Sequence, residues 1–226
     1  PVRSAEEHDD ANTWAASESD VVLPGVKPYA IAELAQEIAP ALREGTVVVS
    51  VAAAITLAKL EASLAEGQPV LRSMPNTPLQ VGRGVVALAR GTHADDTAVD
   101  AARAVFAGSG KVYEVEEDQI DVVSAVSGSG PAYAFYLAEA MADGGAALGL
   151  DKDLARQLAA ATLAGAGLML DTPDADPAAF RKAVTSPKGT TEQAILTFDE
   201  RGVREAIAEG EKNAVARSLQ MAKDYA

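Results

Sequence analysis

The segment Ser124-Ala-Val-Ser-Gly-Ser-Gly-Pro-Ala-Tyr133 precedes a long apolar stretch with helical periodicity. Its glycines allow the backbone to approach a ligand closely, and Pro131 suits the first position of a helix. The free N–H groups of a helix start favour a bound carboxylate or phosphate. The segment therefore predicts a helix that begins at Pro131 with an anion site at its start.

A second segment of the same character, Thr185-Ser-Pro-Lys-Gly-Thr-Thr191, also lies just before a helical pattern. Two anion-receiving helix starts in one helical region indicate a small acidic metabolite as the ligand. An ordinary Gly/Ser loop with a helix cap explains either segment alone equally well. Both interpretations stay open from the residues themselves.

The residues before this region alternate between strand and helix signals. Thr46-Val-Val-Val-Ser50 is an uninterrupted β-branched run, which is typical of parallel sheets covered on both faces. Residues 20–28 read as a buried strand broken by Pro24. Further strands are expected at 69–73, 84–89 and 111–115, and helices at 29–43, 56–66 and 95–108. The alternation predicts a doubly wound α/β sheet with its ligands beyond the carboxyl ends of the strands.

After about residue 117 the strand signals stop. Helices are expected at 118–126, 131–149, 151–170, 177–184, 190–200 and 202–224. The prediction is therefore an α/β domain over residues 1–117 followed by an all-α domain over 118–226. A helical domain this short and apolar would bury its faces against another subunit, so we expect a homodimer or a higher homo-oligomer.

Composition excludes several classes of function. The formal net charge of −14 argues against nucleic acid or an anionic membrane as partner. The chain has no cysteine, which excludes disulfides and thiolate catalysis and fits a cytoplasmic location. No apolar run has the length of a membrane span. The sequence contains no His/Asp/Glu cluster that would predict a metal site.

In this order and spacing, a set of short motifs resembles the pyrroline-5-carboxylate reductase family, which carries out the last step of proline biosynthesis. The resemblance runs from about Asn12 to the C-terminus. Its landmarks are Val26-Lys-Pro28, Ser50-Val-Ala-Ala-Ala-Ile55, Met74-Pro-Asn-Thr-Pro78, Ser127-Gly-Ser-Gly-Pro-Ala-Tyr133, Glu139-Ala-Met-Ala-Asp143, Thr185-Ser-Pro-Lys-Gly-Thr-Thr191 and Arg217-Ser218.

The resemblance implies a Rossmann-like dinucleotide-binding domain and a helical dimerisation domain. It implies an oxidoreductase that uses NADPH, with NADH possible. Arg3 and Ser4 would meet the adenosine ribose, where an arginine suits a 2′-phosphate. Asn76 would fix either a carboxamide or neighbouring backbone. The other cofactor-binding residues implied are Asn12, Val26, Lys27, Pro28, Ala52, Ala53, Ala54 and Pro75.

The same resemblance places the substrate, 1-pyrroline-5-carboxylate, in the helical domain. Gly189, Thr190 and Thr191 would line the ring pocket and bind its carboxylate through backbone N–H groups. Thr191 would be the catalytic residue, offering its hydroxyl to the ring nitrogen while hydride adds to the C=N bond. Ser129 and Gly130 would close the opposite side.

The chain departs from the family pattern at several points. Family members usually have glycine at Lys188 and Ala54, and alanine at Gly25. The sequence also lacks a Gly-x-Gly-x-x-Gly turn for the pyrophosphate. We therefore expect that the first strand, turn and helix are missing, or that residues are missing between Ser4 and Asn12.

Two rival functions remain open at this point. One is a related two-domain β-hydroxyacid dehydrogenase, although no lysine stands in a recognisable acid/base pattern. The other is a non-catalytic ligand-binding or dimerising protein that lacks the cofactor loop.

Overall fold

The structure is a computed structural model, and it describes Ser4, Glu6 and residues 8–224. The chain forms two compact units. The first comprises the described residues up to Ser129 together with those from Lys212 onward, and the second is Gly130–Glu211. The predicted boundary at residue 117 follows the change in secondary structure. The compact units instead follow packing, because residues 120–128 contact the sheet.

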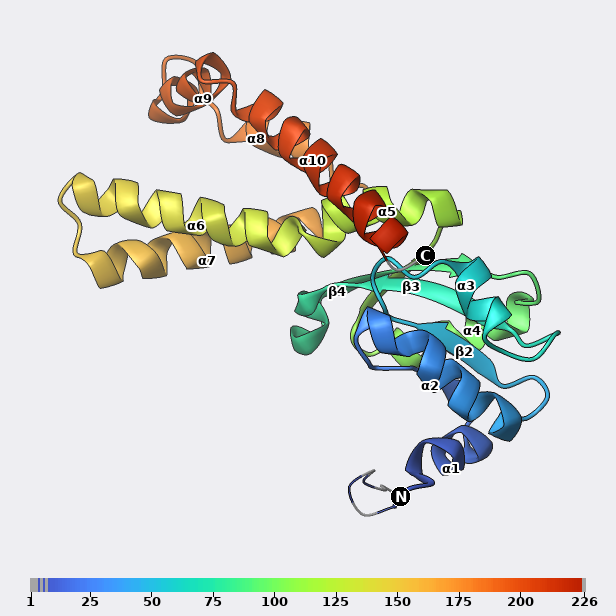
Figure 1. Cartoon of the computed structure of the whole chain (residues 1–226). Helices are drawn as coiled ribbons and strands as arrows, with labels where there is room; N and C mark the ends of the chain where they lie inside the picture. The colour runs from blue at the N-terminus through green and yellow to red at the C-terminus, as the bar shows by residue number, and fades with distance from the viewer. Residues whose placement is uncertain (1–3, 5, 7, 225–226) are drawn as a thin grey trace. The chain divides into compact units, whose positions relative to one another are not determined.

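The first unit is built on a five-stranded sheet of order β1-β2-β3-β4-β5 (Figure 1). The strands are β1 (Val21–Val22), β2 (Val47–Ser50), β3 (Val70–Pro75), β4 (Gly84–Arg90) and β5 (Gly110–Glu114). β1, β2 and β3 are parallel, and so are β4 and β5. β4 runs antiparallel to β3, so the expected βαβ rhythm breaks at one connection.

The reversal at β4 follows from the length of the connection. Only residues 76–83 separate β3 from β4, and they form the 3-10 helix η3 (Thr77–Val81). A parallel return requires a crossover of about a dozen residues or more. The chain therefore turns back beside β3, and the next crossover helix restores the parallel direction.

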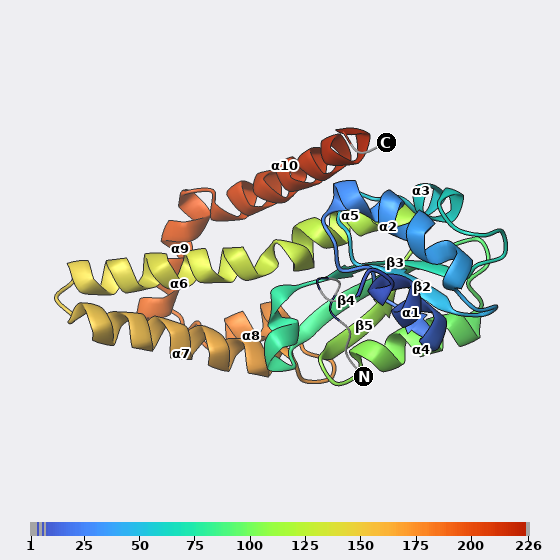
Figure 2. The same ribbon diagram turned by 60° about the horizontal axis from the view of Figure 1, so that its bottom comes forward.

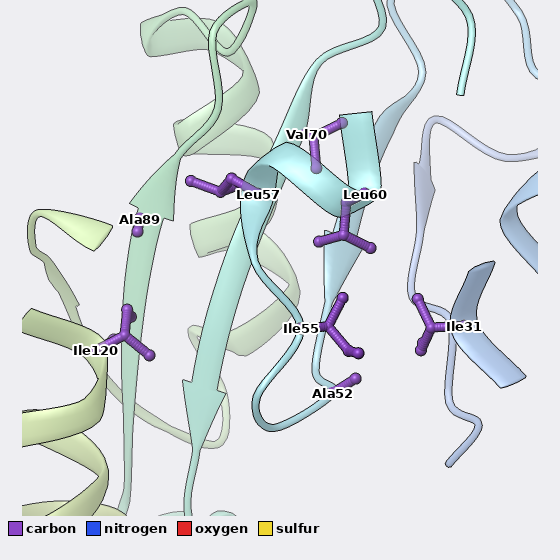
Figure 3. Close-up of a cluster of buried hydrophobic side chains, with 9 residues drawn as sticks. Ile31, Ala52, Ile55, Leu57, Leu60, Val70, Ala89 and Ile120 are labelled. Atoms are coloured by element: carbon purple, nitrogen blue, oxygen red, sulfur yellow. The ribbon is translucent and has the colours of Figure 1, made fainter. Parts of the chain in front are cut away.

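Side chains of alternate residues along the strands divide the core into two clusters. Val70 and Ala87 join a cluster with residues of α2, α3 and α5, whose members Figure 3 shows. Their sequence neighbours Leu71 and Val86 join the cluster that includes residues of α4. Because successive side chains of a strand point to opposite faces, both faces of the sheet are covered.

The helices of the first unit lie close to the predicted ranges, with two exceptions. They are α1 (Ala11–Glu18), η1 (Pro28–Ala30), α2 (Ile31–Ile38), η2 (Ala39–Ala41), α3 (Leu57–Ala62), α4 (Asp96–Phe106), η4 (Glu117–Gln119) and α5 (Ile120–Val123). α1 was not predicted. Its negligible amphipathicity explains this, because periodicity is the main sequence signal for a helix.

The second exception is the start of the long helix after residue 129. The predicted loop before Pro131 is wrong, because residues 124–128 form a π-helical turn and Ser129 is also helical. The amide of Ser129 donates to the carbonyl of Ser124, five residues back, at 2.8 Å. These amides are used within the helix, so the anion site predicted at this helix start is not present as a free N-terminus.

In the second unit, all the regular secondary structure of the described residues is helical. Its helices are α6 (Gly130–Ala147), α7 (Lys152–Leu170), α8 (Pro177–Ala183), α9 (Thr190–Glu200) and the first part of α10 (Val203–Asp224). Figures 1 and 2 show α6 and α7 side by side. Large apolar side chains remain exposed on both helices, including Phe135, Tyr136, Leu158 and Leu168. No helix in the described part of the chain has the length and apolar character needed to cross a bilayer.

An ion-pair group ties β4 and β5 to α4. Arg90 on β4 binds the carboxylate of Glu114 on β5 through two nitrogens, and it also contacts Asp96 at 2.7 Å. Arg103 on α4 reaches Glu114 at 3.3 Å. The hydrogen bond from Arg90 lowers the pKa of Glu114 below its ordinary value of 4.5.

We expect Glu114→Gln to lower the melting temperature at neutral pH. The folded-state pKa of Glu114 is depressed, so its contribution is present above the unfolded value and is lost as pH falls through the folded value. Thermal melts of both proteins over a pH series should therefore converge in acid. A difference that persists unchanged in acid would show that the charge of Glu114 is not responsible.

Candidate active site

The candidate cofactor residues lie mainly in three loops at one edge of the sheet. β1, β2 and β3 are parallel neighbours, so their carboxyl ends meet at the same edge. The loop after β1 carries Val26–Pro28, the loop after β2 carries Ala52–Ala54, and β3 ends at Pro75 followed by Asn76. Ligands of open α/β sheets bind at such an edge.

The three alanines of the middle loop differ in exposure. Ala52 and Ala54 are buried, whereas Ala53 is exposed. Ala54 has a φ of 65°, in the left-handed region that favours glycine. This conformation explains why glycine is usual at that position in the family that the sequence resembles. Of the three, Ala53 is the one exposed to solvent.

Asn76 is tied to two other segments of the first unit. Its side-chain Nδ2 donates to the carbonyl of Ser127 at 2.9 Å, and its Oδ1 accepts from the amide of Val85 at 2.8 Å. The backbone amide of Asn76 donates to the carbonyl of Val85 at 3.1 Å. Of the two predicted roles for Asn76, the orientation of neighbouring backbone is therefore the one with observed contacts.

Of the candidates at the start of the chain, the described ones, Ser4 and Asn12, make side-chain contacts elsewhere. Arg3 lies outside the described residues. The hydroxyl of Ser4 accepts from the amide of Glu6 at 3.2 Å. Asn12 lies on α1 and donates to Glu37 at 3.1 Å. Glu37 is in the last turn of α2, which starts after β1 and leads away from the carboxyl edge, so the structure does not bring Asn12 to the three loops.

The substrate candidates of the second unit lie at the start of α9. Gly189 caps the helix, and a Cβ atom there would lie 2.9 Å from the carbonyl oxygen of Ser186, so the close approach requires glycine. The carboxylate of Glu192 accepts from the amide of Lys188 at 2.7 Å. The hydroxyl of Thr191 has no hydrogen-bond partner among the described residues, which leaves it available to a ligand.

Lys188 occupies a strained backbone position in this loop. Its φ is 61°, and its side chain is exposed. Left-handed backbone costs an L-residue roughly 1–2 kcal/mol, whereas glycine adopts it freely. The strain accounts for the glycine usual at this position in the resembled family.

A buried arginine under the carboxyl edge was missed from the sequence. Arg72 on β3 is 4% exposed, contacts Glu117 at 3.2 Å and lies 3.8 Å from Asp121. Glu117 also accepts from the amide of Leu57 at the start of α3 at 2.7 Å. Asp121 accepts from the hydroxyl of Ser218 on α10 at 2.6 Å.

This group corrects one interpretation and explains a landmark. An acidic run such as Glu116-Glu117-Asp118 commonly lies in a solvated turn or a helix start, but the carboxylate of Glu117 pairs with Arg72 and accepts from the first amide of α3. Ser218, part of a landmark with no assigned role, anchors α10 to α5. A charged residue inside an apolar strand, as at Arg72, is the sequence signal that could have revealed the group. Among the described residues, no group of three His, Cys, Asp or Glu side chains is placed to hold a metal ion.

Comparison with known proteins decides the family. A sequence model described as pyrroline-5-carboxylate reductase dimerisation matches residues 117–221, and one described as NADP oxidoreductase, coenzyme F420-dependent, matches residues 5–54. The pyrroline-5-carboxylate reductase of Pseudomonas aeruginosa is 41% identical over 216 residues, covering 95% of this chain and 79% of that protein. That of Corynebacterium melassecola is 40% identical over 215 residues, covering 94% and 80%. The chain belongs to the pyrroline-5-carboxylate reductase family.

Solved structures of the pyrroline-5-carboxylate reductase family confirm the fold. The Coxiella burnetii reductase superposes with a TM-score of 0.88 at 35% identity, covering 92% of this chain and 78% of that one. The Plasmodium falciparum reductase with NADP bound gives a TM-score of 0.83 at 25% identity, with coverages of 93% and 80%. The predicted family and the predicted pairing of a Rossmann-like domain with a helical domain are both confirmed.

We expect Arg72→Met to lower the free energy of unfolding by about 2–3 kcal/mol, because two partly buried carboxylates lose their cation. The matched control is Arg43→Met. Arg43 pairs with Asp20 on the surface at 2.8 Å, and its loss should cost under about 1 kcal/mol. Urea denaturation of the two variants measures the difference. Equal losses would show that the Arg72 group is no more stabilising than a surface pair.

We expect Lys188→Gly to raise the free energy of unfolding by about 0.5–1 kcal/mol. Relief of the left-handed strain exceeds the entropy that glycine adds to the unfolded chain. Lys182→Gly, in the last turn of α8, is the control and should destabilise by up to about 1 kcal/mol. A free energy of unfolding that is lower for Lys188→Gly than for the unsubstituted protein, measured from denaturation curves, would contradict the role assigned to strain.

Proposed function

We propose that this chain reduces 1-pyrroline-5-carboxylate to L-proline with NADPH, the last step of proline biosynthesis. The observation that carries the proposal is the 40–41% identity, over almost the whole chain, to relatives named for this substrate. The three loops at the carboxyl edge supply the expected place for the nicotinamide end of the cofactor. NADH remains a possible alternative donor.

The residues at the carboxyl edge fit the nicotinamide cofactor. Ala53 is exposed and small, and Val26, in the loop after β1, is 38% exposed, so both loops offer apolar side chains to a ligand at this edge. We propose that Val26–Pro28, Ala52–Ala54 and Pro75 frame the ribose and the nicotinamide. Arg3, Ser4 and Asn12 stay predictions for the adenosine side. When bound, NADPH supplies the hydride that adds to the carbon of the C=N bond.

The start of α9 fits the acidic substrate. We propose that the amides of Gly189, Thr190 and Thr191 bind its carboxylate, since the first amides of a helix attract anions. The hydroxyl of Thr191 donates a hydrogen bond to the ring nitrogen. As hydride adds to the carbon, the π electron pair of the C=N bond moves to that nitrogen, which takes a proton from solvent water through the Thr191 hydroxyl and becomes the secondary amine of proline. Ser129 and Gly130 are proposed as further substrate contacts.

The helical unit also fits self-association. The match to a dimerisation family covers it, and apolar side chains of α6 and α7 are exposed in the single chain. We therefore propose a homodimer or higher homo-oligomer formed through residues of this unit. The cytoplasmic location expected from the cysteine-free composition stays a prediction.

We expect Thr191→Ala to reduce kcat by about tenfold or more, because a hydrogen bond to the reacting nitrogen worth about 1.4 kcal/mol is lost. The assay follows NADPH oxidation by the full-length gene product with 1-pyrroline-5-carboxylate. Thr197→Ala is the matched control, because its hydroxyl is bound to the carbonyl of Gln193 at 2.9 Å on the same helix.

The outcomes separate the rival functions. Turnover that falls in Thr191→Ala but not in the control supports both the reaction and the role of Thr191. Turnover unchanged by either substitution keeps the reaction and removes that role. No turnover by a protein that binds NADPH, with activity on a hydroxyacid, favours the β-hydroxyacid dehydrogenase. A protein that binds no NADPH is better explained as a non-catalytic ligand-binding protein.

A further inference from the structure

The π-helical turn at residues 124–128 has an unusual hydrogen-bonding problem. In an α-helical register, the carbonyl of Ser127 would accept from the amide of residue 131. That residue is Pro131, which has no N–H to donate. The amide of Ser129 bonds five residues back to Ser124, so the helix is locally widened at this point. Such turns occur frequently at functional sites.

Asn76 supplies a donor to this carbonyl from outside the helix. Its Nδ2 lies 2.9 Å from the oxygen of Ser127, while its Oδ1 is held by the amide of Val85 at 2.8 Å. The side chain is therefore fixed at both ends. It connects the start of β4 to the π-helical turn, directly beyond the carboxyl end of β3.

A second contact brings the same turn against the strand. A Cβ atom on Gly128 would lie 2.7 Å from Cε of Met74, so the turn packs closely against this side chain of β3, whose flexible end would have to move to admit a larger residue. The hydroxyl of Ser127 donates to the carbonyl of Val123 at 3.0 Å and so satisfies another carbonyl of the widened helix. The turn is thus packed and hydrogen-bonded onto the end of β3.

The residue that follows the turn, Ser129, has a hydroxyl that is available to a ligand. Ser129 is half-buried, and its hydroxyl has no hydrogen-bond partner among the described residues. Its place along the chain is set by the turn that Asn76 holds. A shift of the turn would move Ser129 relative to the carboxyl edge, where the nicotinamide is proposed to bind.

We propose that Asn76 is a positioning residue: through the carbonyl of Ser127 it holds the π-helical turn on the carboxyl end of β3 and so places Ser129 for the reaction. This inference rests on the proposed function for the identity of that reaction. It assigns Asn76 a role through the protein backbone rather than through the cofactor. Asn76 thereby acts on kcat more than on the affinity for NADPH.

The chemistry of the amide makes the role testable by one isosteric substitution. In Asn76→Asp, the carboxylate can still accept from Val85, but it presents an oxygen to the carbonyl of Ser127. Only the protonated carboxyl can donate to that carbonyl, which restores the bond. The repulsion between the two oxygens favours the protonated carboxyl, in opposition to the Val85 amide, which favours the ionised form, and the protonated fraction grows as the pH falls toward the carboxyl pKa. Activity relative to the unsubstituted enzyme should therefore rise as the pH falls.

The experiment measures kcat and KM of the full-length enzyme, Asn76→Asp and Asn213→Asp from about pH 8 to about pH 5, a range that approaches the ordinary carboxyl pKa. Asn213 is exposed on α10 and provides a charge-matched control. We expect kcat of Asn76→Asp to fall at least about tenfold at the upper pH, equivalent to about 1.4 kcal/mol, with a smaller change in KM for NADPH. Part of the loss should be recovered at the lower pH, and the control should follow the unsubstituted enzyme throughout.

Amide hydrogen exchange of residues 124–129 provides a readout that does not need turnover. Faster exchange in Asn76→Asp than in Asn213→Asp, together with the pH-dependent loss of kcat, supports the proposal. Faster exchange with unchanged kcat overturns the positioning role, and so does a loss of kcat that is independent of pH. No turnover by the unsubstituted enzyme overturns the proposed function and the positioning role with it, while unchanged exchange with normal turnover overturns the anchor alone.

Discussion

The parallel alignment of β1, β2 and β3 is the constraint on which the candidate cofactor site depends. Because neighbouring strands run in one direction, three loops that are far apart in the sequence end at one edge. The strand Val47–Ser50, with its three β-branched valines, lies between the other two strands and is buried along its whole length. Burial of this strand on both faces fixes its register with its neighbours. The positions of Val26, Ala53 and Asn76 follow from that packing, because each lies just beyond the carboxyl end of one of the three strands.

The Arg72 group connects this sheet to two helices that border the edge. Glu117 joins Arg72 to the first amide of α3, which begins just after the loop that carries Ala53. Asp121 joins the same region to Ser218, near the C-terminal end of the chain. Contacts this far apart in sequence cannot be derived from local patterns, although Arg72 stands out as a charged residue in an apolar strand.

Much of the fold could be predicted from the sequence because its signals are local. Val47–Ser50 is recognisable by β-branching, and α2 and α4 by strong amphipathic periodicity. The reversal at β4 was also accessible, since residues 76–83 are too few for a crossover. The π-helical turn could not be predicted from the sequence, because Gly and Ser next to Pro131 normally indicate a loop. The contact that stabilises the helical alternative comes from Asn76, which is distant in the sequence. The placement of Asn12 against Glu37 likewise depends on a tertiary contact.

The alternation of side chains along β3 also bears on how reliably the chain folds. Val70 faces the cluster of α2, α3 and α5. Arg72, two residues further along, faces the same side, where its carboxylate partner Glu117 lies. A slip of one residue in strand pairing would turn Arg72 toward the apolar face of α4, where Ala98, Val99 and Ala102 are buried. A cation buried there without a partner would cost several kcal/mol. The guanidinium therefore acts as a check on strand alignment during folding, penalising misaligned sheets that hydrophobicity alone would tolerate.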